Sequence, residues 1–309
     1  MVKLWHRPEN TVDFQGWLCG TVSMKQPDLA SPVHMMSQAE LDRQYSPSRL
    51  VDSLDDYLED YAKRSVAARE QLAGTTKIGL KYGPDARHRL DYFPVGRAGA
   101  PLMVFFHGGF WSALDESSFS FPASAFLGAG VNYASVSYRL APLARLTEIV
   151  ADARQAIGWL RSQAHNLGFD PTQIIVAGHS AGAHLAAMLM AAGDAPFKGA
   201  LLVSGVYDLE PVRLSYVNDI VRMDAAEAKA NSPFFQQPVG RFATHIAVGS
   251  DETNEFKRQS ALLRDSWREQ LPSCTMTEYA GRDHFDILFD LADPSSTLFA
   301  ETLNLLKNR

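Results

Sequence analysis

The chain has 309 residues, of which 46% are hydrophobic and 21% charged, and its formal net charge is −6. These values predict a globular protein with a substantial core in one large domain. The negative charge and the lack of a Lys/Arg block argue against nucleic-acid binding. No apolar stretch approaches the roughly 20 residues that span a membrane, and the N-terminal residues show neither the apolar run nor the cleavage site of a signal peptide. The cysteines, Cys19 and Cys274, are far apart, which argues against a disulfide framework or zinc site and favours a cytoplasmic location.

The first 75 residues differ in character from the rest of the chain. Residues 1–35 are mixed in composition, with prolines at 8, 27 and 32, and predict an extended arm. Residues 37–72 are rich in charge and predict helices, mainly from 51 onwards. This helical segment is either a cap over the mouth of an active site or a plain surface helix. We therefore divide the chain into an arm and cap-like segment, 1–75, and a main domain, 76–309, within one structural unit.

From residue 77 onwards, short apolar runs alternate with helical stretches. The runs at 78–82 and 89–93 predict an antiparallel lead-in to a sheet. Further strands are predicted at 101–106, 131–138, 174–177, 200–203, 244–248 and 275–279, and helices at 146–167, 181–192 and 255–269. Continuous apolar runs are typical of strands buried on both faces. The alternation predicts an α/β protein with a mostly parallel central sheet flanked by helices.

A candidate nucleophile lies in the sequence Gly-His-Ser-Ala-Gly at 178–182, between a predicted strand and an apolar helix. A tight turn from strand to helix needs Gly178 and Gly182, because side chains there would collide. Such a turn exposes the Ser180 hydroxyl at the carboxyl edge of the sheet and aims the Ala181 N–H at a developing oxyanion. The competing interpretation is a glycine-rich turn with an incidental serine. The pattern predicts the nucleophile of a serine hydrolase with an α/β-hydrolase fold.

A second glycine-rich motif, His-Gly-Gly-Phe-Trp at 107–111, follows another predicted strand. The N–H groups of Gly108 and Gly109 are expected to supply the other donors of an oxyanion hole. Loss of one such donor typically costs about 3 kcal/mol of transition-state stabilisation. His107 is expected to brace this loop rather than to act as the base. Phe110 and Trp111 are either core residues or an aromatic wall for the substrate.

Ser180 needs a general base, because a free serine hydroxyl is a weak nucleophile at neutral pH. His284 follows a strand-like run late in the chain, which is where this fold carries its catalytic histidine. His245 lies within a predicted strand. His179 and His184 are too close to the serine in sequence to reach back to it in the usual geometry. The predicted base is therefore His284.

The acid that orients His284 is expected on the loop after the strand at 244–248, which carries Asp251, Glu252 and Glu255. A carboxylate there would hold the imidazole and stabilise its cation without taking up the proton. Each of the three also suits the start of the following helix, where a carboxylate caps the helix or complements its dipole. Spacing alone does not decide between Asp251 and Glu252.

With these motifs in place, the chain from about residue 37 to its end resembles the kynurenine formamidase (arylformamidase) branch of the esterase/lipase superfamily. The two glycine-rich motifs are shared with esterases that resemble hormone-sensitive lipase. The aromatic-Trp pair after His-Gly-Gly, Glu-Phe-Lys-Arg-Gln-Ser and Asp-His-Phe-Asp are more particular to the formamidases. The segments that carry the resemblance are 44–48, 82–84, 90–91, 107–111, 136–142, 178–182, 204–209, 215–219, 255–260 and 283–286.

The resemblance implies Glu252 as the acid, because the family's acid lies three residues after a strand-ending glycine and six before the Arg of Arg-Gln. It also implies that an aryl formamide or amide such as N-formylkynurenine is cleaved through an acyl-enzyme, with no metal or organic cofactor. The aromatic leaving group would stack on Phe110, Trp111 or Tyr207. The alternatives are a short-chain carboxylesterase and a non-catalytic binding module. The expected partner is a small aromatic amide or ester, not nucleic acid or membrane, and a homodimer is left open.

Overall fold

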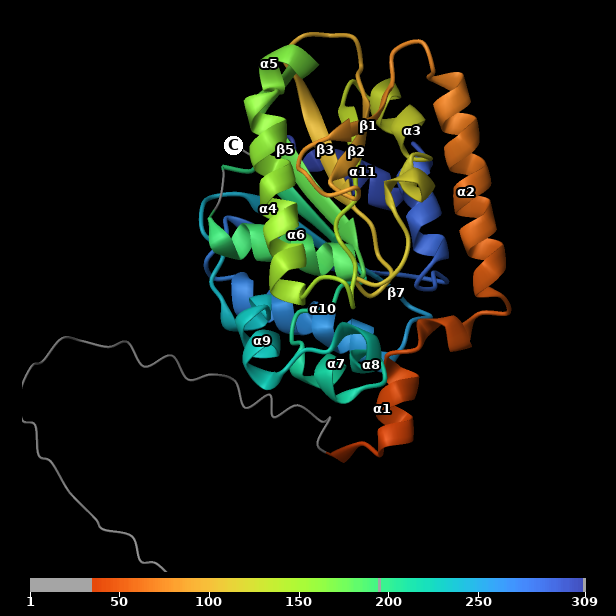
Figure 1. Ribbon diagram of the computed structural model, residues 1–309, viewed down its shortest axis with the longest axis vertical. Helices are drawn as coiled ribbons and strands as arrows, with labels where there is room; N and C mark the ends of the chain where they lie inside the picture. The colour runs from red at the N-terminus through yellow and green to blue at the C-terminus, as the bar shows by residue number, and fades with distance from the viewer. Residues whose placement is uncertain (1–34, 194–195, 308–309) are drawn as a thin grey trace, which may run out of the picture.

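The computed structural model describes residues 35–193 and 196–307. Its strands are β1 (Lys77–Lys81), β2 (Arg89–Phe93), β3 (Ala100–Phe106), β4 (Asn132–Val136), β5 (Phe169–His179), β6 (Gly199–Val203), β7 (Ala243–Gly249) and β8 (Ser273–Tyr279). They form one sheet in the order β1-β2-β4-β3-β5-β6-β7-β8. Strand β2 is antiparallel to both of its neighbours, and all other pairs are parallel. The predicted α/β fold with a mostly parallel sheet is confirmed (Figure 1).

Helices lie on both faces of this sheet. The α-helices are α1 (Gln38–Gln44), α2 (Leu54–Gln71), α3 (Ala123–Gly128), α4 (Leu146–Ser162), α5 (Ala164–Leu167), α6 (Ala181–Ala192), α7 (Glu210–Leu214), α8 (Asn218–Val221), α9 (Ala225–Ala230), α10 (Asn254–Trp267) and α11 (Thr297–Asn304). The 3-10 helices are η2 (Pro47–Leu50), η3 (Glu116–Phe119), η4 (Pro233–Phe235) and η5 (Asp286–Ala292). None of the helices in the described part of the chain has the length and apolar character needed to cross a bilayer.

Alternate side chains of the central strands enter two hydrophobic cores, one on each face of the sheet. In β3, Leu102, Val104 and Phe106 belong to the first core, and Met103 and Phe105 to the second. The first core is covered by α4, α5, α6 and α10, and the second by α2, α3, η5 and α11. Because both faces are covered, the central strands are apolar at successive positions, as their sequences predict.

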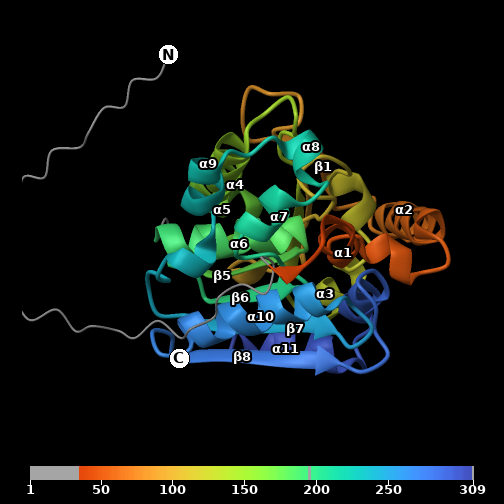
Figure 2. The ribbon, with the colours of Figure 1, turned by 90° about the horizontal axis from the view of Figure 1, so that it is seen from below.

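The carboxyl ends of the parallel strands meet at one edge of the sheet, and the loops with the candidate site residues leave from this edge. These loops follow β3, β5, β6, β7 and β8. In an open α/β sheet this edge is the usual place of a ligand site, because the strand ends and the helix N-termini converge there. The segment from α1 to α2 lies beside the same edge in both ribbon views, with α2 along the outside of the body (Figures 1 and 2).

Most expected elements match observed ones, with two kinds of difference. The stretch at 146–167 is divided into α4 and α5 at Gln163, and Gly168, in the left-handed conformation, ends α5. The short helices α3, α7, α8, α9 and α11 had no predicted counterpart. They have four to eight residues, which is about two turns at most and too few for an apolar repeat to identify. Apart from Met35, the arm expected at 1–35 lies outside the described residues.

Candidate active site

Ser180 lies at the turn between β5 and α6, with φ 54° and ψ −118°. A residue other than glycine is strained in this conformation, typically by about 1–3 kcal/mol. The N–H of Ser180 donates to the carbonyl of Val203 at 2.8 Å, which holds the turn against β6. A Cβ on Gly178 would lie 2.2 Å from the carbonyl carbon of Gly182, and a Cβ on Gly182 would lie 2.0 Å from the carbonyl oxygen of Phe106. The close approach of three backbone segments therefore requires both glycines.

The loop after β3 packs against this turn. A Cβ on Gly108 would lie 3.2 Å from the Cβ of Ser180, so a larger residue would press on the serine. Gly109 has φ 98°, and its Cβ would lie 2.6 Å from the carbonyl oxygen of Ala113. Ala181 is the first residue of α6, and N–H groups in the first turn of a helix have no partner within the helix. The structure thus brings Gly108 and Ala181 next to Ser180, and Gly109 lines the same cavity as the serine.

His107 braces the loop from within the core. Its Nδ1–H donates to the carbonyl of Gly108 at 2.8 Å, and its ring stacks on Tyr138 with centroids 4.3 Å apart. The Tyr138 hydroxyl in turn donates to the carbonyl of His107 at 2.7 Å. Burial lowers the pKa of His107 to about 4, so the imidazole is neutral near pH 7. A neutral, doubly held ring suits a structural role in shaping the loop.

His284 is paired with Glu252. The His284 Nδ1 lies 2.7 Å from the Glu252 Oε2, and both side chains are buried. The other carboxylate oxygen accepts hydrogen bonds from the Ser204 hydroxyl at 2.6 Å and from the Gly249 N–H at 2.7 Å. Asp251, by contrast, is exposed and accepts a hydrogen bond from the Ser250 hydroxyl. The structure brings Glu252 to the histidine and turns Asp251 to the solvent.

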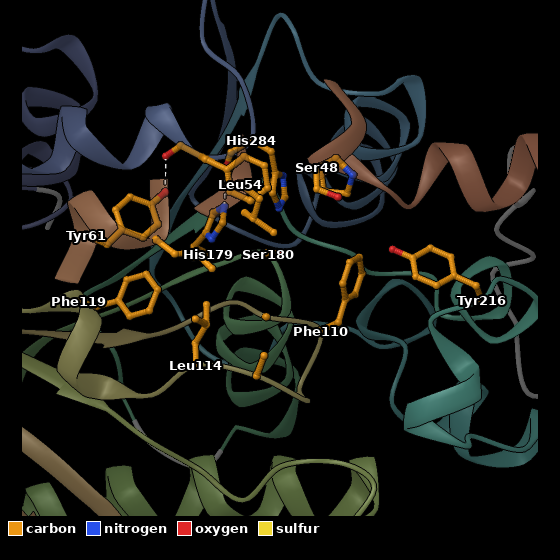
Figure 3. A pocket seen from close by; sticks show the side chains of 15 residues that line it. Ser48, Leu54, Tyr61, Phe110, Leu114, Phe119, His179, Ser180, Tyr216 and His284 are labelled. Carbon is orange, nitrogen blue, oxygen red and sulfur yellow. Dashed lines mark hydrogen bonds between the residues drawn. The ribbon is translucent and has the colours of Figure 1, made fainter. Parts of the chain in front are cut away.

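His179 forms a second contact with the histidine loop. Its Nε2–H donates to the backbone carbonyl of His284 at 2.8 Å, and the two ring centroids are 4.6 Å apart (Figure 3). Burial, followed by the nearby His284, holds the pKa of His179 well below its usual value. Phe256 of α10 covers the His284 ring, with centroids 4.4 Å apart. The roles of His179 and Ser204 were not predicted, because both follow from contacts between loops that are distant in sequence.

Ser180 and His284 open into the same cavity of about 210 Å³. Most of its walls are apolar or aromatic. Side chains from the segment before β1 and from the loop after β8 both line it (Figure 3). The lining residues are Pro47, Ser48, Leu54, Leu58, Tyr61, Gly109, Phe110, Ala113, Leu114, Phe119, His179, Ser180, Tyr216, His284 and Phe285. A substrate group bound here would be largely removed from water.

The three aromatic residues expected to bind substrate occupy different places. Phe110 is partly buried and lines the cavity. Trp111 and Tyr207 are fully buried, with 0% of each side chain exposed, and belong to the first core. The Trp111 ring packs edge-on against His184, with centroids 5.0 Å apart. These two aromatic rings therefore pack behind the site, while Phe110 forms part of its wall.

The segment before β1 supplies one side of the cavity. Pro47 and Ser48 come from η2, and Leu54, Leu58 and Tyr61 from one face of α2. Of the two interpretations left open by the sequence, this geometry favours the cap over the plain surface helix. In the sequence, the only mark of this cap was the Gln-Tyr-Ser-Pro-Ser segment at 44–48. It contributes to the resemblance to the formamidases, but no role was predicted for it.

A buried polar network docks this segment onto the start of α10. The Tyr45 hydroxyl donates to the Glu255 carboxylate at 2.9 Å and accepts from the Gln259 amide at 3.0 Å. The Thr253 hydroxyl donates to the backbone carbonyl of Gln44 at 2.7 Å. Thr253 directly follows Glu252, so this last contact lies next to the carboxylate that pairs with His284. The segments at 44–48 and 255–260 are thus the two halves of one contact.

Comparison with known proteins agrees with this architecture. Kynurenine formamidase of Danio rerio is 31% identical over 289 residues, which cover 88% of this chain and 97% of the relative. Carboxylesterase NlhH of Mycobacterium tuberculosis is 39% identical over 114 residues, which cover 36% of this chain and 35% of the relative. A family model described as BD-FAE matches residues 91–208.

A solved structure extends the similarity to three dimensions. It is described as a candidate thioesterase from Silicibacter sp. TM1040, is 30% identical in sequence and superimposes with a TM-score of 0.76. The match covers 84% of this chain and 98% of that one. Similarity to known proteins thus extends over most of the chain in both sequence and structure.

Proposed function

Because this chain belongs to the kynurenine formamidase family of α/β-hydrolases, we propose that its substrate is an aryl formamide or related aryl amide of the N-formylkynurenine type. The chain is a hydrolase of the serine-hydrolase type that acts on amides or esters. The finer assignment rests on the similarity to formamidases along nearly the whole chain, and on the aromatic wall that Phe110 forms in the cavity.

In the proposed mechanism, Ser180 is the nucleophile and His284 the general base. His284 removes the hydroxyl proton as the serine oxygen attacks the carbonyl carbon, and the N–H groups of Gly108, Gly109 and Ala181 hold the oxyanion. When the C–N bond breaks, His284 gives this proton to the leaving amine. A water molecule, activated by the same histidine, then releases the acid from the acyl-enzyme. One amide and one water thus give one carboxylic acid and one amine.

The observation that carries the proposal is the pairing of His284 with Glu252 beside a strained serine. Glu252 accepts the Nδ1–H of His284 at 2.7 Å, which leaves the His284 Nε2 as the free base. The hydrogen bonds from Ser204 and Gly249 hold the carboxylate in place. Because Glu252 is buried, its charge would stabilise the imidazolium formed in the first step with little screening by water.

A short-chain carboxylesterase is the second candidate. It is favoured by the NlhH relative, whose similarity reaches 39% over 114 residues, although this stretch covers only 36% of the chain. The proposed catalytic groups suit an ester as well as an amide, because both pass through a tetrahedral oxyanion. The leaving group separates the two candidates, since an aniline nitrogen must be protonated as it departs and a phenolate oxygen need not be.

The two candidates are tested by comparing kcat/KM for N-formylkynurenine and for 4-nitrophenyl acetate in the purified protein. We expect the formamide to be the better substrate, and Ser180→Ala to abolish both activities. A strong preference for the ester would refute the formamidase assignment and support the carboxylesterase. If the folded protein hydrolysed neither substrate and failed to react with a fluorophosphonate probe, it would be a non-catalytic binding module.

We also propose a cytoplasmic location, as the cysteine content suggests, with Cys274 present as a free thiol. The homodimer left open by the sequence stays a prediction. Size-exclusion chromatography with light scattering would give the assembly state, and a fluorescent fusion in cells of the source organism would give the location.

A further inference from the structure

The cavity extends to both sides of Ser180, and the two sides differ in construction. On one side lies a group of apolar residues that we call the inner lobe, namely Leu58, Tyr61, Leu114, Phe119 and Phe285. All of them belong to the second core or pack against it. On the other side lie Ser48, Phe110 and Tyr216, which we call the mouth, and Phe110 packs against the first core. Figure 3 shows Tyr61, Leu114 and Phe119 across Ser180 from Phe110 and Tyr216.

The aromatic residues of the inner lobe are buried, whereas Leu58 and Leu114 are partly exposed. The exposed fractions of Tyr61, Phe119 and Phe285 are 2%, 1% and 8%. The Tyr61 hydroxyl donates to the backbone carbonyl of Phe285 at 2.5 Å, so its polar atom is already bonded. The Tyr61 and Phe119 rings contact each other, with centroids 5.6 Å apart. A ligand in this lobe would contact buried ring faces and the side chains of two partly exposed leucines.

The mouth is more open. Tyr216 is 42% exposed, and Ser48 is partly exposed at the edge of η2. The Tyr216 hydroxyl donates to the backbone carbonyl of Tyr45 at 3.2 Å, which ties the mouth to the docked segment. A substituent on this side can extend past the cavity walls into solvent.

A carbonyl group attacked by Ser180 has two substituents, the acyl chain and the leaving group. Each side of the cavity therefore binds one of them. The leaving group is the one that must depart first and that tolerates polar or large additions, which suits the mouth. The acyl group stays bound to the serine until water arrives, which suits the more buried, apolar lobe. We propose, on the basis of the function proposed above, that the inner lobe is the acyl pocket and that it accepts unbranched acyl groups larger than formyl.

In this arrangement Leu58 and Tyr61, both on α2, are the residues that set acyl size. They come from the segment before β1, whereas Ser180 and His284 come from the loops after β5 and β8. The chemistry and the acyl specificity would therefore reside in different parts of the chain. Each methylene buried in an apolar lobe adds about three- to fourfold to kcat/KM until the lobe is full.

The test is the acyl-length series of 4-nitrophenyl esters from acetate to octanoate, assayed with the full chain. We expect kcat/KM to rise about ninefold or more from acetate to butyrate, which adds two methylenes, and to fall for chains longer than the lobe. Leu58→Trp should fill the lobe, so that the butyrate-to-acetate ratio of kcat/KM falls at least tenfold. Leu58→Ala should shift the optimum to longer chains.

The matched control is Val66→Trp, which places the same side chain on an exposed face of the same helix, where Val66 is 51% exposed. This variant should keep the wild-type acyl profile. In a second series, acetate esters of phenol, 4-nitrophenol and 2-naphthol, Leu58→Trp should leave the order of leaving groups unchanged.

Three results would overturn the proposal. A wild-type profile that falls steeply from acetate to propionate would mean that the lobe excludes longer acyl groups. A Leu58→Trp variant that changes the order of leaving groups but not the acyl profile would assign the lobe to the leaving group. If the acyl length with the highest kcat/KM were the same in both Leu58 variants as in the wild type, α2 would have no role in acyl specificity. In all three cases, hydrolysis that depends on Ser180 would still support the proposed function. If the wild-type protein hydrolysed none of these substrates, the proposed function itself would be refuted.

Discussion

At the scale of single residues, the carboxylate of Glu252 accepts hydrogen bonds from three residues at the candidate site. It accepts from His284, Ser204 and the backbone N–H of Gly249. A buried carboxylate held in this way keeps the imidazole in one tautomer and one orientation. The neighbouring Asp251, one residue away, lies in water and contacts the Ser250 hydroxyl.

This difference predicts the effects of two isosteric substitutions. Glu252→Gln should lower kcat by about 10³- to 10⁴-fold, because the amide can hold the wrong tautomer of His284. Asp251→Asn removes the same charge from the same loop and should change kcat less than about threefold. Steady-state kinetics on one ester and one aryl formamide would measure both effects. A large loss in Asp251→Asn with little loss in Glu252→Gln would assign the acid to Asp251.

The sequence predicted Ser180 and His284 as candidates because each lies in a short motif after a strand, and local pattern is enough to place such residues. Spacing alone left Asp251 and Glu252 undecided, and the family resemblance favoured Glu252. The backbone of one loop determines which of these two adjacent carboxylates faces inward. The N–H of Asp251 donates to the carbonyl of Arg282 at 3.0 Å. This contact between loops that are distant in sequence helps to set the orientation and has no local signature.

At the scale of elements, the segment from α1 to α2 is held to the main domain by contacts on both sides of the site. Tyr45 docks on Glu255 and Gln259, at the start of α10. On α2, the Tyr57 hydroxyl donates to Asp283 at 2.7 Å, and the Tyr57 ring stacks on Phe285 with centroids 5.5 Å apart. The residues on either side of His284 thus contact α2 directly.

We predict that Tyr45→Phe lowers both stability and substrate binding. The change leaves the buried Glu255 without one donor, which should cost about 1–3 kcal/mol of the free energy of unfolding. It should also raise KM several-fold, since Ser48 at the mouth lies three residues further along. Urea denaturation and steady-state kinetics would measure the two effects.

Tyr92→Phe provides the control for this prediction. Tyr92 is equally buried, and its hydroxyl donates to the carbonyl of Leu167 at 2.9 Å, at the end of the sheet away from the site. This variant should lose stability without a change in KM. An unchanged KM in Tyr45→Phe would show that the docked segment does not shape the substrate site.

Long elements with a clear apolar pattern were predictable, and contacts that depend on a few residues were not. The helix at 181–192 was predicted with the bounds of α6, because glycines and an apolar run mark it at both ends. The closing of α2 over the cavity was left open, since its pattern suits a surface helix equally well. What decides this placement is a set of hydroxyl and ring contacts to residues more than 200 positions away.

At the scale of the whole molecule, several buried histidines couple folding to pH. Burial lowers the pKa of His107 and of His184 to about 4 and holds that of His179 well below its usual value. In the unfolded chain these groups titrate near 6.5, so the unfolded state binds more protons between pH 6.5 and 4. Stability contributed by these histidines is therefore complete above about pH 6.5 and is lost as the pH falls towards 4.

His184 gives a direct test of this coupling. Its Nε2–H donates to the carbonyl of Asn231 at 2.7 Å, and its buried Nδ1 has no hydrogen-bond partner among the described residues. A shift of this size corresponds to on the order of 3 kcal/mol between pH 7 and 4. His184→Gln should therefore lose less stability on acidification than the wild type, as measured by urea denaturation at several pH values. His165→Gln, at an exposed position in α5, is the control and should lose as much free energy of unfolding on acidification as the wild type. The prediction would be contradicted if the free energy of unfolding fell equally with pH in the wild type and in both variants.

For the whole molecule, we propose that one serine, Ser180, performs all hydrolysis by this chain. Its most direct test is to treat the full chain with a fluorophosphonate and to locate the adduct by peptide mass spectrometry while following residual activity. We predict a single adduct on Ser180, with loss of ester and formamide hydrolysis in parallel with labelling, and neither adduct nor activity in Ser180→Ala. Hydrolysis that persisted in a folded Ser180→Ala variant, or an adduct on another residue that removed the activity, would contradict the account.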